Sequence, residues 1–221
     1  MSKRHKIMRV VKAVILWCIS ILVFIPLIII VLNSFKTQGD SVSMRLALPV
    51  EWVFTNYGDV MEQVNIFGAF MNSAIVSVFT VIIATVGAAL CSYVLSRRRT
   101  KLHKFVYNFF LVGLVAPLNM VPAILVLQRF HLMDTRVGLI LLYSALVTPF
   151  SIFLYYGFIG TVPKEIDEAA IIDGCSLFQA FRRVVTPVVV PGIVTVTVIS
   201  FINIWNDLLF SQIFLTDKKK M

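Results

Sequence analysis

The sequence predicts an all-α polytopic membrane protein, and three observations support this fold class. Of the 221 residues, 59% are hydrophobic and only 14% are charged, with a mean hydropathy of +0.91, which is far from the composition of a soluble domain. Asp, Glu, Lys and Arg are absent from 63–96, 105–128 and 137–163. Each of these stretches exceeds the ~20 apolar residues that a helix needs to cross a bilayer. Basic residues gather beside the apolar stretches, as they do at membrane boundaries.

The net charge of +9 and the pI of 9.7 are interpreted as topology signals. The basic residues form two clusters, at 3–12 and 97–104, and both adjoin apolar runs. Such clusters are typical of cytoplasmic loops, so no nucleic-acid partner is predicted. Residues 1–12 are predicted to be a basic cytoplasmic N-terminus, and 13–221 a single transmembrane domain in the lipid bilayer.

The first span is predicted over 10–32 and is expected to be retained. It is too long for the apolar region of a signal peptide, and no small-residue cleavage site ends it. Pro26 predicts a kink. Residues 36–68 are predicted to be an external loop, because four acidic residues there outnumber two basic ones. Trp52 and Tyr57 in this loop are interpreted as anchors at the membrane interface.

The second and third spans are predicted over 70–95 and 105–127. Small residues along the second span favour close helix packing. The third is interrupted by Pro117 and Pro122 with Asn119 between them, which frees backbone groups and adds a polar side chain at membrane depth. Two interpretations remain open at this point: a helix that faces a cavity, and a kinked structural helix.

The fourth span is predicted over 137–160, interrupted by Pro149, after a short external turn at 128–136. Because an even number of spans precedes them, residues 161–190 are expected to be cytoplasmic. The fifth span is predicted over 191–215. Asp207 lies inside this span, and an ionisable residue there is a functional-site hypothesis by default, although its position near the outer end also lets it reach toward the interface. The polar residues predicted to line a translocation path are Asn119 at the break in the third span and Asn203, Asn206 and Asp207 in the fifth.

The cytoplasmic segment is predicted to form two short helices joined by a turn. Pro163 suits a first helical turn, and the acidic residues that follow suit the positive end of the helix dipole. Gly174 predicts a left-handed stop, and Ser176 with Gln179 predicts a capping box that starts the second helix. Pro187 is expected to end that helix after Arg182 and Arg183.

This segment resembles the EAA loop of ABC-importer permeases through Glu168-Ala169-Ala170, then Asp173-Gly174, and then Pro187 and Pro191. The sequence FINIWNDLLF at 201–210 is similar to the "WN(E/D)" segment of sugar-importer permeases, and 48–57 to the family's "P…W…NY" loop. The resemblance is strongest to the maltose- and glycerol-phosphate-type carbohydrate branch and implies the type I ABC-importer permease fold. Those permeases have a sixth span, and this sequence stops near the loop that would precede it.

The resemblance implies a permease subunit that couples closure of two ATPase subunits to solute movement. It also implies a second permease subunit that forms a heterodimer with this one, an extracytoplasmic solute-binding protein, and a place in the cell membrane. The sequence contains no GxxxxGK[ST] loop, so ATP is expected to bind to the partner and no cofactor to this chain. The residues that the resemblance assigns to ATPase docking are Glu168, Ala169, Ala170, Asp173, Gly174 and Pro187.

Other functional classes are less well supported by the sequence. The three cysteines and three histidines are scattered, so neither a metal site nor a catalytic cluster is predicted. The chain is therefore not expected to be an enzyme. The alternatives are an ion- or proton-coupled secondary transporter that uses Asp207, and a truncated membrane subunit that does not transport.

Overall fold

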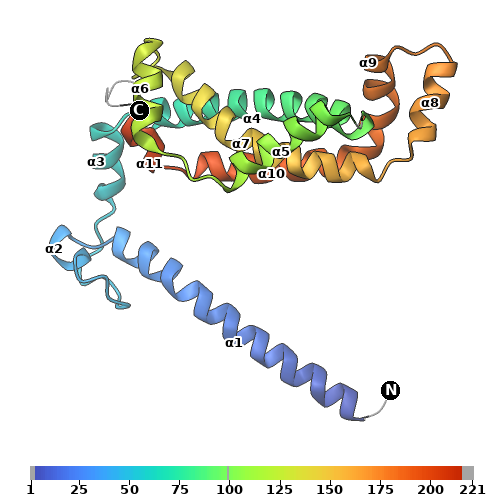
Figure 1. The fold of residues 1–221 in the computed structure, drawn as a ribbon. Helices are drawn as coiled ribbons and strands as arrows, with labels where there is room; N and C mark the ends of the chain where they lie inside the picture. Colours follow the sequence, from blue (N-terminus) through green and yellow to red (C-terminus); the bar gives the residue numbers. More distant parts are fainter. Residues whose placement is uncertain (1–2, 99, 216–221) are drawn as a thin grey trace. The chain divides into compact units, whose positions relative to one another are not determined.

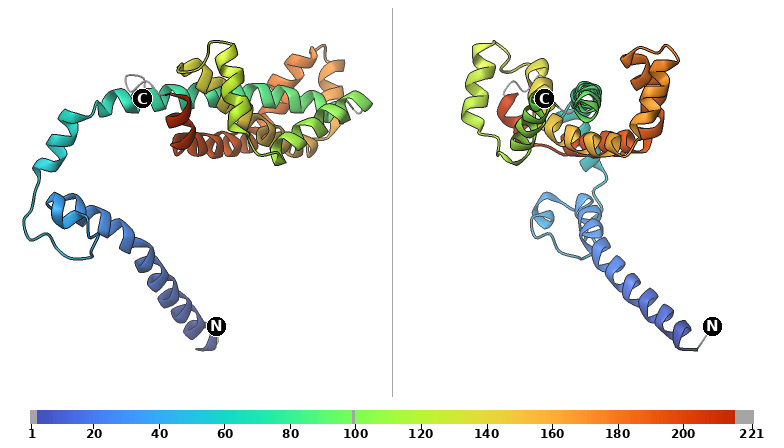
Figure 2. Two further views of the ribbon diagram at one scale, coloured as in Figure 1. Left: turned by 60° about the vertical axis from the view of Figure 1, so that its left-hand side comes forward. Right: turned by 45° about the vertical axis from the view of Figure 1, so that its right-hand side comes forward.

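The computed structural model describes residues 3–98 and 100–215, with the side chains of 3–7 left aside (Figures 1 and 2). The chain divides into two compact units, Met1–Ile66 and Phe67–Met221, which are described separately. A count of five spans predicts an external position for the lysine-rich end at 217–220, and this end lies outside the described residues.

The first unit begins with one long apolar helix, α1 (Lys3–Ser34). Its 27-residue part Met8–Ser34 is long and apolar enough to cross a membrane, in agreement with the predicted first span. The helix continues through Pro26, and apolar side chains are exposed along its length. A helix that is apolar all round fits a lipid environment.

The predicted external loop packs on the end of α1 and contains two short helices, α2 (Gln38–Ser41) and α3 (Thr55–Gln63). Phe35 is the centre of an aromatic cluster, with its ring centroid 5.7 Å from Trp52, 5.3 Å from Phe54 and 5.5 Å from Tyr57. Trp52 and Tyr57 therefore contact protein while about half of each remains exposed. Their role as interfacial anchors stays a prediction.

Hydrogen bonds from the loop also fix the chain at and just after the end of α1. The Asn56 side-chain amide donates to the carbonyls of Ser34 and Lys36 at 3.0 and 2.9 Å. The buried Lys36 ammonium donates to Asn33 Oδ1 and to the Arg45 carbonyl, both at 3.0 Å. Helix ends leave four carbonyls without partners, so these contacts explain why the loop folds back here.

The second unit is a helical bundle built on three long helices, joined by shorter ones at both ends (Figure 1). The long helices are α4 (Ile66–Arg97), α7 (Arg136–Gly160) and α10 (Thr186–Trp205). The shorter elements are α5 (Lys101–Val115), α6 (Met120–Arg129), α8 (Lys164–Ile172), α9 (Leu177–Ala180), η1 (Phe181–Val185) and α11 (Leu209–Phe214).

Several small residues lie on the buried face of α4 and allow the close helix packing that the sequence favours. Ala84 and Ala88 are almost completely buried, and the Ser92 hydroxyl donates to the Ile152 carbonyl of α7 at 3.1 Å. Small side chains let two backbones approach closely enough for such a contact.

The core has two clusters, one at each end of the bundle, and they fix the path of the chain. One joins the end of α4 to the end of α7, through Tyr93 and Ile159. The other joins the start of α4 to the start of α7, through Val76 and Leu139. The chain therefore leaves α4 at one end of the bundle and enters α7 at the other.

The connection between those ends is the broken third span. Helices α5 and α6 are bent by 115° at the break that holds Pro117, and they count as a fifth span only if taken as one. Because they link opposite ends of the bundle, we count them as one broken span, which gives five among the described residues. Asn119 begins α6, and its Oδ1 accepts from the Val121 N–H at 3.2 Å. The break is thus much sharper than a kink.

The predicted end of the second loop helix at Pro187 is wrong. Residues Leu177–Trp205 form one apolar helical stretch, in which η1 is a π-helical turn between α9 and α10. The Thr186 N–H and hydroxyl both bond to the Phe181 carbonyl, five residues back. The hydrogen-bond ladder is already displaced where Pro187 lacks its N–H, so the proline occupies the first turn of α10.

The fifth span also ends earlier than 215. Helix α10 stops at Trp205, and Asp207 lies in a turn before α11. Asp207 Oδ2 accepts from the Phe210 N–H at 3.0 Å, so the carboxylate binds a donor in the first turn of α11. Carboxylates are favoured at the positive end of a helix dipole, which suits Asp207 to this position.

Candidate functional site

The loop between α7 and α10 has the local structure that its sequence predicts. Gly174 ends α8 with φ at +87°, a conformation that glycine adopts without steric cost. At the start of α9 the Gln179 side chain accepts from the Ser176 N–H at 2.9 Å, and Ser176 Oγ accepts from the Gln179 N–H at 3.3 Å. This is the expected capping box. Pro163 stands one residue before α8, as its N-cap.

Of the six residues assigned to ATPase docking, five are exposed and one is buried. Ala170 is 7% exposed and therefore faces the bundle, which leaves Ala169 as the small residue available for close approach by a partner. The exposed residues are Glu168, Ala169, Asp173, Gly174 and Pro187.

The loop also exposes large apolar side chains that are not part of the EAA motif. Ile172 is 86% exposed, Leu177 53% and Phe178 59%, and they flank the turn at Gly174. In the sequence, the sign of this surface is the presence of apolar residues directly beside the predicted turn at Gly174. Exposed apolar groups gathered on a polar loop are typical of an interaction surface.

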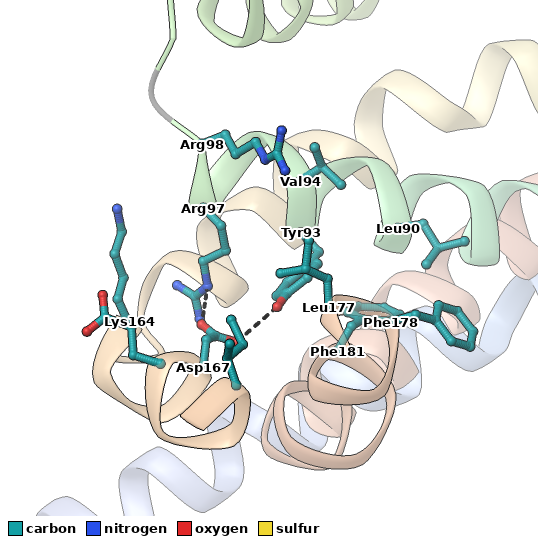
Figure 3. Close-up of a pocket in the computed structure, with 12 residues that line it drawn as sticks. Leu90, Tyr93, Val94, Arg97, Arg98, Lys164, Asp167, Leu177, Phe178 and Phe181 are labelled. Atoms are coloured by element: carbon teal, nitrogen blue, oxygen red, sulfur yellow. Dashed lines mark hydrogen bonds and ion pairs between the residues drawn. The ribbon is translucent and has the colours of Figure 1, made fainter. Parts of the chain in front are cut away.

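A buried ion pair connects this loop to α4. Asp167 is 6% exposed, and its Oδ2 lies 2.5 Å from Arg97 Nε at the end of α4. The Tyr93 hydroxyl, one turn earlier on α4, donates to Asp167 Oδ1 at 3.1 Å (Figure 3). The sequence indicates Asp167 only as one of several acidic residues at a helix start, because its partner Arg97 lies 70 residues earlier in the chain.

The same arginine also binds the end of α7. Arg97 Nη1 donates to the carbonyls of Val162 at 3.0 Å and Ile159 at 3.4 Å. Beside this contact is a cavity of about 430 Å³ between α4 and the loop (Figure 3). It is lined mainly by apolar side chains, with Arg98, Lys164 and Glu168 among the charged ones.

The residues predicted to line a translocation path are not brought to one place. Asn206 and Asp207 line a cavity of about 450 Å³ together with Asn72 and Trp205. Asn119 lines a different cavity, of about 610 Å³, beside the break between α5 and α6. Asn203 is exposed on α10 and lines neither cavity.

Asp207 is held by hydrogen bonds from two helices. Its Oδ2 accepts from the Tyr143 hydroxyl of α7 at 2.5 Å as well as from Phe210, and Tyr143 also contacts the Ser211 hydroxyl at 3.1 Å. The carboxylate therefore joins α7, the end of α10 and the start of α11.

Asp207→Asn is expected to loosen this junction without unfolding the bundle. Hydrogen bonds to a charged acceptor contribute roughly 1.5–3 kcal/mol, and the amide retains only neutral ones. Thermal unfolding in detergent measures the loss. Tyr143→Phe removes one of the same bonds from the other side, so the double variant should lose less than the sum of the two single variants. Additive losses would show that the two residues are energetically independent.

No group of three or more His, Cys, Asp or Glu residues that could hold a metal ion occurs within 3–98 and 100–215. Cys18, Cys91 and Cys175 are free thiols.

Long apolar helices, a broken span and a charged loop define an all-helical, multi-pass membrane protein. The chain belongs to the family described as the binding-protein-dependent transport system inner membrane component, which matches residues 83–219. The matched range runs from the middle of α4 through the loop and α10, and it contains Arg97, Asp167 and Asp207, whereas Asn72 of the cavity beside Asp207 precedes it.

Curated relatives cover nearly the whole chain. It is 38% identical to the diacetylchitobiose uptake system permease protein NgcG of Streptomyces coelicolor, over 93% of this chain and 68% of that protein. It is 34% identical to the melibiose/raffinose/stachyose import permease protein MelC of Bacillus subtilis, over 99% of this chain and 79% of that protein. The multiple sugar-binding transport system permease protein MsmG of Streptococcus mutans is 30% identical, over 100% and 81%.

The fold is also that of a solved transporter. A chain in the crystal structure of a bacterial ABC transporter involved in the import of the acidic polysaccharide alginate superposes with a TM-score of 0.85. The match covers 100% of this chain and 78% of the other, at 24% sequence identity. The predicted fold class, an all-α membrane protein of the ABC-importer permease type, is confirmed.

Proposed function

We propose that this chain is a permease subunit of an ATP-driven importer for a sugar or oligosaccharide, which lies in the cell membrane with its N-terminus in the cytoplasm. The names of the three relatives, which refer to diacetylchitobiose, to melibiose, raffinose and stachyose, and to multiple sugars, support a carbohydrate solute. Family membership supports the general set of partners: ATPase subunits, a second permease and a solute-binding protein.

The proposal rests on the structure of the loop between α7 and α10, which combines a fixed backbone with exposed apolar side chains. Its two helices are fixed by the Gly174 turn and the Ser176 capping box, yet it leaves Ile172, Leu177 and Phe178 exposed. A short helical element with exposed apolar side chains fits a groove on a partner, and Glu168 adds a site for a charge-assisted hydrogen bond. The partner is an ATPase subunit, which supplies the ATP site.

The bundle supports a cytoplasmic position for this loop. The Arg97–Asp167 pair places the loop at the same end as the basic cluster that follows α4. Basic clusters beside apolar helices favour the cytoplasmic side. If α5 and α6 form one broken span, an even number of spans separates the N-terminus from the loop, so a cytoplasmic N-terminus and a cytoplasmic loop agree.

The cavity beside Asp207 is proposed to contact the solute near the opposite end of the bundle. Its lining combines the Trp205 ring with amide and carboxylate groups from Asn72, Asn206 and Asp207. Such groups can hydrogen-bond sugar hydroxyls, and an aromatic ring offers a flat apolar face. The second permease subunit completes the path.

Glu168→Lys is expected to remove the ATPase without disturbing membrane insertion. The exposed carboxylate becomes a cation at the proposed docking surface, and like charge placed against a basic partner costs several kcal/mol. We expect at least about tenfold less ATPase to co-purify from detergent-solubilised membranes, which corresponds to about 1.4 kcal/mol. Glu62→Lys adds the same charge in the predicted external loop and serves as the control. Equal recovery with Glu168→Lys and wild type would contradict docking through this loop.

A further inference from the structure

Arg97 connects three segments that are separate in the sequence. Its backbone ends α4, its Nη1 binds carbonyls at the end of α7, and its Nε pairs with Asp167 of α8 (Figure 3). Tyr93 gives the same carboxylate a second contact from α4. One guanidinium thus joins two membrane-spanning helices to one helix of the loop.

The two halves of the loop are attached to the bundle in different ways. Helix α9 continues through η1 into α10, so it is attached by unbroken helical backbone. Helix α8 is separated from α9 by the turn at Gly174, and it packs on η1 and α9. Its connection to α4 is made by side chains, and Asp167 makes both of the polar contacts described above.

We infer that the Arg97–Asp167 pair is the joint through which a displacement of α8 reaches α4. This inference rests on the proposed function, because it takes the loop to be the part that an ATPase partner moves. Such a movement has three routes into the bundle. The continuous helix carries it from α9 to α10, and the short backbone segment 161–163 carries it from α8 to α7. The ion pair carries it from α8 to α4. Asp167 and Arg97 are positioning residues in this scheme.

The energetics of a buried pair suit this role. A buried ion pair adds little net stability compared with apolar packing, but removing one partner leaves a buried charge uncompensated. Both side chains are largely buried, at 13% exposure for Arg97 and 8% for Asp167. The pair therefore resists separation when α8 is displaced, which a surface pair in water would not do.

Asp167→Asn tests the joint in the complete importer, reconstituted with its ATPase, partner permease and binding protein in lipid vesicles. The amide keeps the shape of the side chain and removes the charge. We expect ATPase co-purification to stay within about twofold, and the sugar imported per ATP hydrolysed to fall about tenfold, which corresponds to about 1.4 kcal/mol. Glu165→Gln makes the same change at an exposed carboxylate of α8 and should leave this ratio unchanged.

A second variant separates coupling from folding. Arg97→Gln is measured alone and combined with Asp167→Asn, and the double variant leaves no unpaired buried charge. Because each single change already breaks the ion pair, the ratio of the double variant should stay close to that of Asp167→Asn alone. Simple addition of the two single losses would overturn the joint, as would loss of the ATPase or an unchanged ratio in Asp167→Asn. If the wild-type assembly imports no sugar in response to ATP, the proposed function fails and the joint fails with it.

Discussion

Gly138→Ala is expected to destabilise the bundle by about 3 kcal/mol, the upper end of the usual cost of overpacking. A Cβ atom at this position would overlap the backbone carbonyl oxygen of Leu132. The Thr135 hydroxyl donates to that carbonyl at 2.7 Å and accepts from the Gly138 N–H at 3.0 Å, so the turn closes directly onto α7. Because the nearest atom belongs to the backbone, the overlap cannot be relieved by the movement of a flexible side chain.

The displacement would also reach α11, because the Asp134 N–H of the same turn donates to the Phe214 carbonyl at 3.2 Å. Thermal unfolding of the purified protein in detergent measures the effect. Gly157→Ala, on the same helix with nothing within 4 Å of the added Cβ, is the matched control and should be neutral or slightly stabilising. If both variants unfold at the same temperature, the carbonyl of Leu132 can move aside and the turn does not constrain Gly138.

Gly174→Val is expected to abolish coupled transport while leaving the spans folded. At φ +87° a β-branched side chain is a steric outlier, so the turn must change conformation and α8 must move relative to α9. The strain of roughly 1–3 kcal/mol is local to an exposed loop. ATP-driven sugar uptake in reconstituted vesicles is the measurement, and a decrease of at least about tenfold is expected, equivalent to about 1.4 kcal/mol.

Gly174→Asn is the control for this variant, because asparagine tolerates a left-handed backbone better than other residues with a side chain. Space is not the issue at this position, since nothing lies within 4 Å of a Cβ. Uptake by Gly174→Asn should therefore exceed uptake by Gly174→Val several-fold. Equal losses would mean that the bare backbone of the glycine, rather than its conformation, is needed.

Features set by neighbours in the sequence were predictable. The capping box at Ser176 depends on a partner three residues away, and the stop at Gly174 on its own backbone. The long apolar helices followed from the absence of charge over more than 20 residues. These local signals were sufficient for the fold class and for the main elements of the loop.

Features set by tertiary contacts were not predictable from one sequence. The Arg97–Asp167 pair joins residues 70 apart, and no local pattern indicates that this arginine turns toward the loop. Asp207 looked like a residue inside a span, but its bond from Tyr143 and the start of α11 place it in a turn. Pro187 was misjudged because a π-helical turn supplies the hydrogen-bond shift that a proline otherwise breaks.

That π-helical turn at Phe181–Val185 also sets the rotational phase of the helix that contains it. One residue advances an α-helix by roughly 100°, and a π turn holds one residue more than the α turn it replaces. Side chains before the turn are therefore rotated about the axis relative to those after it. One uninterrupted helix can present the face of Leu177 and Phe178 to a partner outside the membrane while Val189 and Val196 remain inside the bundle.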